Sequence, residues 1–193
     1  MELLTGIFSA FGLSASAGLN AYIPLLVVAL ITRYTDWFTL NQPWDALGNG
    51  WVIGLLVVLS VIEFFADKIP AVNHVNDVIQ TLIRPVAGAI VFAASAKVVT
   101  NIHPVLSLAC GLFVAGSVHA VKSIAVRPAV TATTAGTGNI PVSIAEDLVA
   151  TFVSILAAVV PVFISALIVM ITAWVIWLIW RRINRERRIK LIT

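Results

Sequence analysis

Two carboxylates lie in or beside an apolar stretch of this sequence, where ionised side chains are costly and tend to pair, line a wet cavity or do chemistry. Glu63 lies inside the stretch, and Asp67 follows four residues later on the same helical face. Like charges this close repel each other unless a proton or a cation lies between them. We therefore predict that Glu63 and Asp67 take part in proton or cation coupling. The alternative is structural pairing with Lys68, Arg84 or Lys122.

A second group of residues has the chemistry of a site for an anion or a lipid headgroup. His119 and Lys122 lie three residues apart, on one face at the end of an apolar stretch, although snorkelling of the lysine to headgroups explains it equally well. The stretch TATTAGTGNIP offers glycines whose backbone could turn sharply and present N–H groups to an anion. The predicted anion or headgroup site comprises Lys68, Arg84, His119, Lys122, Arg127, Gly136, Gly138 and Asn139.

Local patterns around these residues predict where helices begin. The Arg-Pro pairs at residues 84–85 and 127–128 are each interpreted as a helix start, because proline is tolerated in a first turn. A cation there, next to the positive end of the helix dipole, favours an anion nearby. The stretch from Ser143 to Glu146 matches a capping box, which would explain Glu146 and partly Asp147 without any ligand.

Motifs for other chemistries are missing from the sequence. It contains neither His-Glu-x-x-His nor Gly-x-Ser-x-Gly, and its glycine-rich stretch lacks the Gly-Lys-Ser/Thr ending of a nucleotide-binding loop. The three histidines are not spaced as metal ligands. We therefore predict no enzymatic activity, no metal and no cofactor.

The composition indicates that the elements which position these residues lie in a membrane. Only 11% of the 193 residues are charged, against about 25% in a soluble domain, and the mean hydropathy is +1.03. Several apolar stretches approach the roughly 20 residues that a membrane-spanning helix needs. We predict an all-α fold, a polytopic membrane helix bundle of about six spans. These spans are predicted at residues 3–31, 51–66, 82–99, 104–121, 144–160 and 162–180.

Residues 1–180 are predicted to form a single transmembrane domain, followed by a basic cytoplasmic tail at residues 181–193. A basic cluster directly after an apolar stretch is typical of a cytoplasmic stop that contacts anionic lipid, and nucleic acid is not expected as a partner. An even number of spans then places both termini in the cytoplasm of a multi-pass protein of the cell inner (plasma) membrane. The fifth and sixth spans meet at Pro161 without a polar residue, so one long kinked helix is the alternative.

The first apolar stretch, residues 3–31, is too long for one comfortable span, at about 44 Å against a hydrocarbon core of about 30 Å. Small and polar residues interrupt its middle. We predict a broken or re-entrant helix, in which hydroxyl and amide side chains satisfy the freed backbone groups. The residues assigned to this break are Ser14, Ser16, Gly18 and Asn20.

Six spans also divide into three and three, which would place the two halves in opposite orientation, as in the inverted repeats of many transporters. The stretch AGLNAYIP at residues 17–24 echoes AGSVHAVKSIAVRP at residues 115–128. A 3+3 inverted repeat is therefore one interpretation, and chance similarity between apolar segments is the other.

The elements SAGLNAYIPLL, EFFADKIP, IRPVAGAI, VHAVKSIAVRP and SIAEDLVA occur in this order. The ordered set resembles the bacterial integral-membrane family described as domain of unknown function 4126, over about residues 12–161. The resemblance implies a small multi-spanning membrane protein, and it brings no catalytic residues with it.

Together these features favour a small transporter or channel for an anionic solute or lipid headgroup, with proton coupling through Glu63 or Asp67. Its partners would be the lipid bilayer, anionic lipids at the basic tail and, as an open alternative, further copies of the chain. The competing hypothesis is a structural or accessory membrane protein whose charges only pair with one another.

Overall fold

The computed structural model describes residues 2–35, 40–99 and 102–159, together with the single positions 174, 177, 180 and 181. This part of the chain is helical and contains no strand. Its helices are α1 (Glu2–Leu19), α2 (Tyr22–Tyr34), the short 3₁₀ helix η1 (Trp44–Gly48), α3 (Gly50–Ala66), α4 (Pro70–Val99), α5 (Pro104–Val121), the π-helical turn η2 (Lys122–Val126), α6 (Arg127–Thr134) and a last helix, Asn139–Val159.

Within the described residues, three helical segments are long and apolar enough to cross a membrane: Asn76–Ala96, Pro104–Thr134 and Asn139–Val159. Shorter apolar helices accompany them at Gly6–Leu19, Tyr22–Tyr34 and Gly50–Ala66. The prediction of an all-α membrane helix bundle is thereby confirmed. Pro161 and most of the predicted sixth span and basic tail lie outside the described residues.

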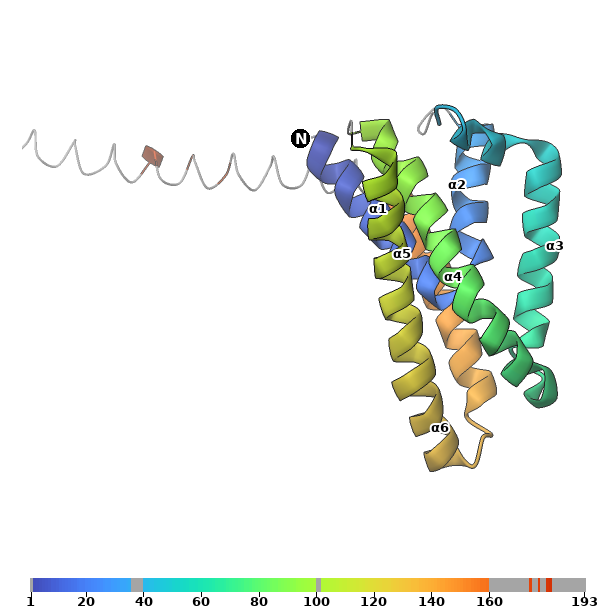
Figure 1. Ribbon diagram of the computed structural model, residues 1–193. Helices are drawn as coiled ribbons and strands as arrows, with labels where there is room; N and C mark the ends of the chain where they lie inside the picture. Colours follow the sequence, from blue (N-terminus) through green and yellow to red (C-terminus); the bar gives the residue numbers. More distant parts are fainter. Residues whose placement is uncertain are drawn as a thin grey trace, which may run out of the picture.

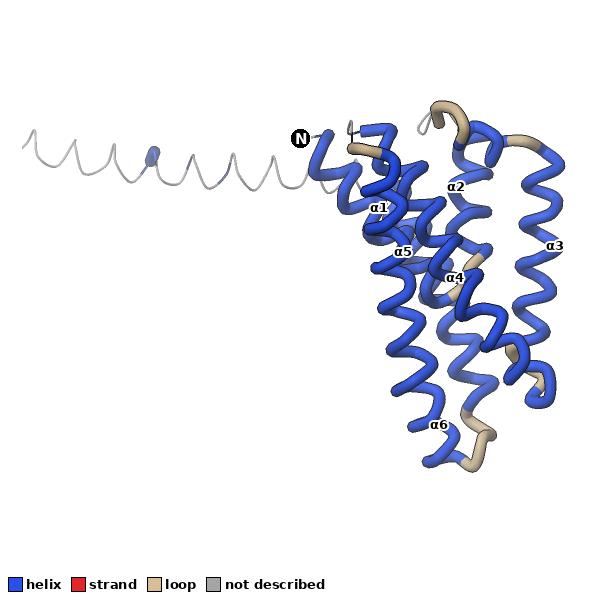
Figure 2. Tube along the Cα trace, viewed as in Figure 1, coloured by secondary structure: helices blue, strands red, loops and turns tan. Residues whose placement is uncertain are grey.

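The first apolar stretch folds back on itself. α1 runs parallel to α5 and reaches only part-way along the bundle, and α2 then returns, so that Glu2 and Tyr34 lie at the same end (Figure 1). Figure 2 shows the non-helical link between α1 and α2 at this mid-bundle position. The chain is therefore broken and re-entrant in this stretch, and it does not cross as one span. We call α1 and α2 the re-entrant pair.

The break lies at the C-terminal end of the segment predicted for it. Asn20 Oδ1 accepts hydrogen bonds from the backbone N–H groups of Tyr22 and Ile23, both at 3.1 Å, and so caps α2. Ser14 and Ser16 lie inside α1, where neither serves the break. Their hydroxyls instead donate to backbone carbonyls of the two neighbouring helices, Ser14 to Gly111 at 2.8 Å and Ser16 to Ala150 at 2.7 Å.

Small residues let α1 lie against the centre of the bundle. A Cβ added at Gly18 would lie 2.6 Å from the carbonyl oxygen of Ala115, so only glycine permits this approach. Gly111 meets the backbone of α4 in the same way, with an added Cβ 2.5 Å from the carbonyl oxygen of Gly88. Close backbone approach of this kind is how membrane helices gain van der Waals contact. The tip of the re-entrant pair is thereby held at a fixed depth.

The two segments that echo each other in sequence lie side by side. Gly18 packs against Ala115, and Leu19 lies near Lys122, so α1 and α5 run in the same direction. An inverted repeat would place them antiparallel. This relation is not found between the two segments.

Two predicted helix starts are wrong. Pro85 lies inside α4, so the first Arg-Pro pair begins no helix. The second pair does begin α6, with Pro128 in its first turn, although α5, η2 and α6 together form one continuous helical segment. Ser143 lies within the last helix, which already begins at Asn139. Its hydroxyl is buried there without a hydrogen-bond partner among the described residues, so it forms no capping box. Proline is tolerated inside membrane helices because neighbouring groups satisfy the freed carbonyl.

The helix Pro104–Thr134 has 31 residues. It is therefore about 46 Å long, whereas the hydrocarbon core is about 30 Å thick. The α6 part extends past the level at which α3 ends (Figure 1). The connection between α3 and α4, with Asp67 and Lys68, therefore lies at the same end of the bundle as α6.

Candidate functional site

Eight ionisable side chains of the described residues meet below the tip of the re-entrant pair, and seven ion pairs join them. They come from α3 and the turn that follows it, α4, η2, α6 and the last helix. All are buried or nearly so. We call this group the charge cluster; its members are Glu63, Asp67, Lys68, Arg84, Lys122, Arg127, Glu146 and Asp147.

Arg84 is the most enclosed member, with no exposed surface. Its Nε and Nη2 donate to Oε1 of Glu63 at 3.3 and 3.0 Å, and its Nη2 lies 3.5 Å from Oδ2 of Asp67. The third nitrogen, Nη1, lies 3.2 Å from Nδ1 of His119. Every nitrogen of this guanidinium therefore has a partner, and none remains for a ligand.

The hydrogen bonds around His119 fix its tautomer. Arg84 can only donate, so Nδ1 of His119 accepts and carries no proton. The hydroxyl of Thr81 donates to the carbonyl of Asp77 at 2.8 Å, and it therefore accepts from Nε2–H of His119 at 3.2 Å. His119 is thus a neutral imidazole that links Arg84 to the Thr81 hydroxyl, and it adds no charge for anion binding.

One carboxylate oxygen serves three cations. Oδ2 of Asp67 lies 3.5 Å from Arg84, 3.8 Å from Lys122 and 3.5 Å from Arg127. Its other oxygen accepts from Nδ2 of Asn76 at 2.7 Å. The three cations more than compensate the single negative charge of Asp67. Arg84 also pairs with Glu63, so it relieves the repulsion between the two carboxylates.

The π-helical turn brings two cations to one face. The backbone N–H of Arg127 bonds to the carbonyl of Lys122, five residues earlier, whereas an α-helix would link residues four apart. Lys122 and Arg127 therefore lie one turn apart, and both contact Oε2 of Glu146, at 2.9 and 3.0 Å. Turns of this kind are frequent at functional sites, and this one determines where Arg127 points.

The tip of the re-entrant pair is bonded directly to the charge cluster. Lys122 Nζ donates to the carbonyl of Leu19 at 3.0 Å, which satisfies the negative end of α1. Asn20 Nδ2 donates to Oδ1 of Asp147 at 3.0 Å, and the other oxygen of Asp147 pairs with Lys68 at 3.1 Å. A movement of the tip would therefore break hydrogen bonds to members of the charge cluster.

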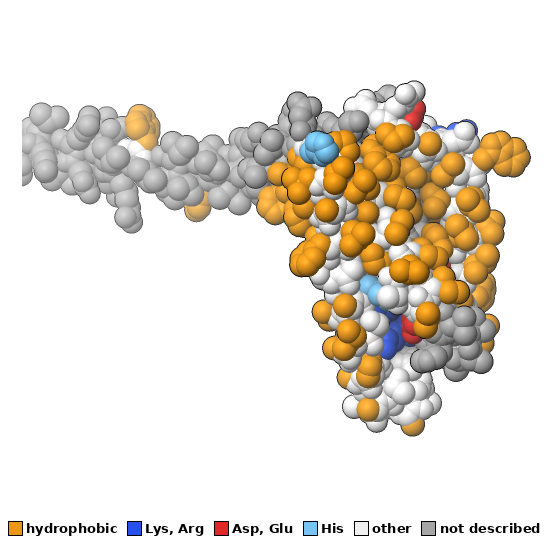
Figure 3. Space-filling view, in the orientation of Figure 1, with side chains coloured by type: hydrophobic (Ala, Val, Ile, Leu, Met, Phe, Trp, Pro, Cys, Tyr) orange, Lys and Arg blue, Asp and Glu red, His pale blue; other side chains and the backbone are white. Residues whose placement is uncertain are grey.

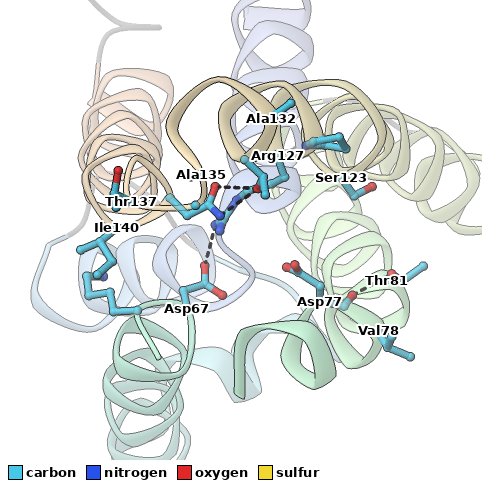
Figure 4. A pocket seen from close by; sticks show the side chains of 15 residues that line it. Asp67, Asp77, Val78, Thr81, Ser123, Arg127, Ala132, Ala135, Thr137 and Ile140 are labelled. Carbon is cyan, nitrogen blue, oxygen red and sulfur yellow. Dashed lines mark hydrogen bonds and ion pairs between the residues drawn. The ribbon is translucent and has the colours of Figure 1, made fainter. Parts of the chain in front are cut away.

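A cavity of about 1050 Å³ adjoins the cluster on the side away from the re-entrant pair. Figure 4 shows side chains from α4, α6 and the last helix around it. In Figure 3 the charged side chains on the lower part of the molecule lie in a hollow, below a surface that is largely apolar. Its polar or charged lining residues are Asp67, Lys68, Asp77, Thr81, Ser123, Arg127, Thr131, Thr137 and Asn139.

Two groups at this cavity have unused bonding capacity. Nε and Nη1 of Arg127 are buried and have no hydrogen-bond partner among the described residues, although Nη2 pairs with Glu146 and Asp67. The carboxylate of Asp77 makes no hydrogen bond or ion pair with the side chains that the structure describes. Buried donors without partners are rare and call for a ligand, a water or an ion.

The other residues predicted for anion binding have partners within the protein. Lys68 donates to Asp147 and to the carbonyl of Phe64, and its ammonium lies 3.2 Å from the centre of the Phe64 ring. Lys122, like Arg84, is enclosed by its partners. The backbone N–H groups of Gly138 and Asn139 bond to Thr134 and Gly136 within their own turn, although Gly136 and Asn139 do line the cavity.

Several contributing residues and contacts were not assigned to the site from the sequence. Asp77 and Thr81 lie one turn apart on α4 and both line the cavity, a signal present in the i, i+4 spacing. The hydrogen bond between Asn20 and Asp147 joins residues 127 positions apart, and no sequence pattern predicts it. The hydroxyl pair of Ser16 and Ser154, at 2.6 Å, is equally remote.

These features define a helical membrane bundle in which a re-entrant pair ends on a buried charge cluster beside a cavity. The profile of one protein family, described as domain of unknown function (DUF4126), matches residues 7–181. The chain belongs to this family, as its ordered motifs predicted. No curated protein and no solved structure gave a significant match.

Proposed function

We propose that the protein is a small membrane transporter that binds the anionic group of a solute or lipid headgroup at Arg127. The unpaired Nε and Nη1 of Arg127 carry this proposal. Of the four cations in the charge cluster, Arg127 alone combines unpaired donors with a place in the cavity lining. A planar guanidinium edge with two free N–H groups matches carboxylate and phosphate geometry.

The protein covers these donors in the described conformation, so binding requires the guanidinium to turn toward the cavity that its side chain lines. Such a turn weakens its pairing with Asp67 and Glu146. Both carboxylates also pair with Lys122, which bonds to the tip of the re-entrant pair. Ligand binding at Arg127 would thereby be transmitted to the tip, which supports transport over passive binding.

Proton coupling is a further part of the proposal. Oε2 of Glu63 is buried and has no hydrogen-bond partner among the described residues, while Oε1 accepts both bonds from Arg84. An unpaired carboxylate oxygen is a place where a proton can reside. A series of hydrogen bonds joins the cavity to Glu63; it runs from Thr81 through His119 to Arg84.

We further propose that the charge cluster faces the cytoplasm in the bacterial inner membrane, since Lys68, Arg84, Lys122 and Arg127 gather at one end of the bundle. The cytoplasmic N-terminus predicted from the sequence depended on residues 3–31 crossing the membrane as one span. Because α1 and α2 turn back, the start of α1 lies at the opposite end, with Tyr34. The N-terminal side of α1 is then extracytoplasmic.

The accessory hypothesis draws support from the pairing itself. Seven ion pairs engage all eight members of the cluster, as expected for charges that only hold helices together. Against it stand the unpaired donors of Arg127 and the cavity that this residue lines. Buried charges serving structure alone are expected to be fully satisfied.

Uptake into proteoliposomes distinguishes the two functions. Radiolabelled inorganic phosphate, propionate and O-phosphoethanolamine serve as probes for the two anionic groups. We expect uptake of at least one probe above protein-free liposomes, and its loss in Arg127→Gln. Arg33→Gln is the matched control, because Arg33 lies near the opposite end of the bundle and bonds to the carbonyl of Gly48. Uptake that is absent for every probe, or equal in both variants, would favour the accessory role.

A further inference from the structure

We propose that the ligand of this cavity is a zwitterion, whose anionic group binds Arg127 and whose ammonium group binds Asp77. The inference rests on the proposed function and specifies its substrate class. It follows from the charge balance of the site and from the placement of its two groups with unused bonding capacity.

Among the residues that the structure describes, the site holds one more carboxylate than it has cations. Four cations of the charge cluster face four carboxylates of the same cluster, and Asp77 adds a fifth acid at the cavity wall. His119 does not redress the balance, because its hydrogen bonds make it neutral. The fully ionised site therefore carries one net negative charge.

A simple anion would make this imbalance worse. Bound at the buried guanidinium of Arg127, it would add its own negative charge where the described residues already include an excess of acid. Uncompensated charge in such surroundings is strongly unfavourable. An anionic group can bind here favourably only when positive charge enters with it.

Asp77 provides the place for that positive charge. It lies on α4, whereas Arg127 lies on α6, and Figure 4 shows the two residues on different walls of one cavity. A carboxylate without an ion pair among the described residues is a suitable partner for a primary ammonium. A ligand lying between the two walls would pair both of its charges at once.

The remaining lining residues fit a small polar molecule joined to an apolar part. Hydroxyls of Thr81, Thr131 and Ser123 lie around the cavity, and Val78 and Ile140 line it as well. This chemistry suits either the headgroup of an aminophospholipid or a free amino-acid-like solute. In both, an anion and an ammonium are separated by a short linker.

Titration calorimetry on the protein in phosphatidylglycerol nanodiscs tests the inference. Two probes carry an ammonium: β-alanine has no net charge, and O-phosphoethanolamine keeps about one negative charge near pH 7 because its phosphate monoester is mostly dianionic. Their matched anions are propionate and inorganic phosphate, and ethylamine is the matched cation. We expect at least one zwitterion to bind about tenfold more tightly than its matched anion, a difference of about 1.4 kcal/mol. Neither ethylamine nor the anions should approach that affinity.

Two variants assign the two ends of the ligand. Asp77→Asn should remove the preference, so that zwitterion and anion bind equally, whereas Asp45→Asn, in η1 near the opposite end of the bundle, should retain it. Arg127→Gln should abolish binding of both. Adding phosphatidylethanolamine to the nanodiscs distinguishes the source: competition with O-phosphoethanolamine indicates a lipid headgroup, and its absence a soluble ligand.

Three outcomes would overturn this inference alone. If the anion binds as tightly as the zwitterion to the wild-type protein, or the preference survives Asp77→Asn, the ligand is not recognised through its ammonium. If an anion binds with uptake of one proton, seen as a dependence on buffer ionisation enthalpy, a proton supplies the positive charge instead. These results leave the proposed function intact, whereas no binding by any probe, together with no uptake, removes both.

Discussion

Arg84 holds the centre of the charge cluster, because it is fully buried and its nitrogens pair with Glu63, Asp67 and His119. Removing this cation leaves Glu63 as an enclosed carboxylate without a partner. Breaking a buried ion pair in this way typically costs about 3–5 kcal/mol. We expect Arg84→Gln to lower the melting temperature of the detergent-purified protein by several degrees or to prevent its folding.

The double variant Arg84→Gln/Glu63→Gln is the control for this prediction. It removes both charges together, so it should recover a substantial part of the stability that Arg84→Gln alone loses. A double variant no more stable than Arg84→Gln would show that Glu63 does not depend on Arg84 for its charge compensation.

The sequence anticipated part of this pairing. Glu63 and Asp67 were expected to need a proton or a cation between them, and Arg84 occupies that place. The importance of Arg127 relative to Lys68, Arg84 and Lys122 could not be foreseen. It depends on the π-helical turn, which shifts the helix face by a residue, and no composition rule identifies such a turn from one sequence.

Among the elements, the re-entrant pair depends on Asn20, whose oxygen caps α2 and whose amide bonds to Asp147. Asn20→Asp retains the cap and replaces the amide donor by a carboxylate facing Asp147. A hydrogen bond to a charged group contributes about 1.5–3 kcal/mol, and repulsion adds to its loss. We expect a lower melting temperature for Asn20→Asp, with a partial recovery in Asn20→Asp/Asp147→Asn. Equal stability of wild type and Asn20→Asp would contradict the linkage between tip and cluster.

Close packing of the re-entrant pair against α5 gives a second test. Gly18→Ala would place a methyl group 2.6 Å from the carbonyl oxygen of Ala115, which belongs to the backbone and cannot move aside. Gly54→Ala is the matched control, because an added Cβ there meets nothing within 4 Å. We expect Gly18→Ala to destabilise by about 1–3 kcal/mol, as overpacking does. Gly54→Ala should be neutral or stabilising, since alanine is the better helix former.

Helix composition was easier to foresee than helix boundaries. The span at residues 51–66 lies within a residue of α3, because an uninterrupted apolar stretch has one simple interpretation. The helix starts assigned to Pro85 and Ser143 failed because membrane helices continue through proline and polar residues when neighbouring helices supply partners. The break in the first stretch was predictable from its length, but its location at Asn20 follows from contacts with distant helices.

On the scale of the whole molecule, the fold makes a prediction about sidedness. The start of α1 and the η1 region lie at one end of the bundle, and the turn around Gly136 lies at the other. In a Cys110→Ala background, a cysteine replacing Asp45 should be labelled from the same side of the membrane as an N-terminal tag. A cysteine replacing Gly136 should be labelled from the opposite side. A tag on the Gly136 side would require the first apolar stretch to cross the membrane.

Under the proposed function, a charged ligand enters the cavity and pairs with Arg127. A high-resolution structure in lipid nanodiscs, determined with O-phosphoethanolamine and again with β-alanine, would show this ligand in place. We expect ligand density within hydrogen-bonding distance of Nε and Nη1 of Arg127, with the ammonium end toward Asp77. If neither probe gives ligand density in the cavity, and Arg127 pairs only with Asp67 and Glu146, ligand binding at Arg127 is contradicted and the accessory role is favoured.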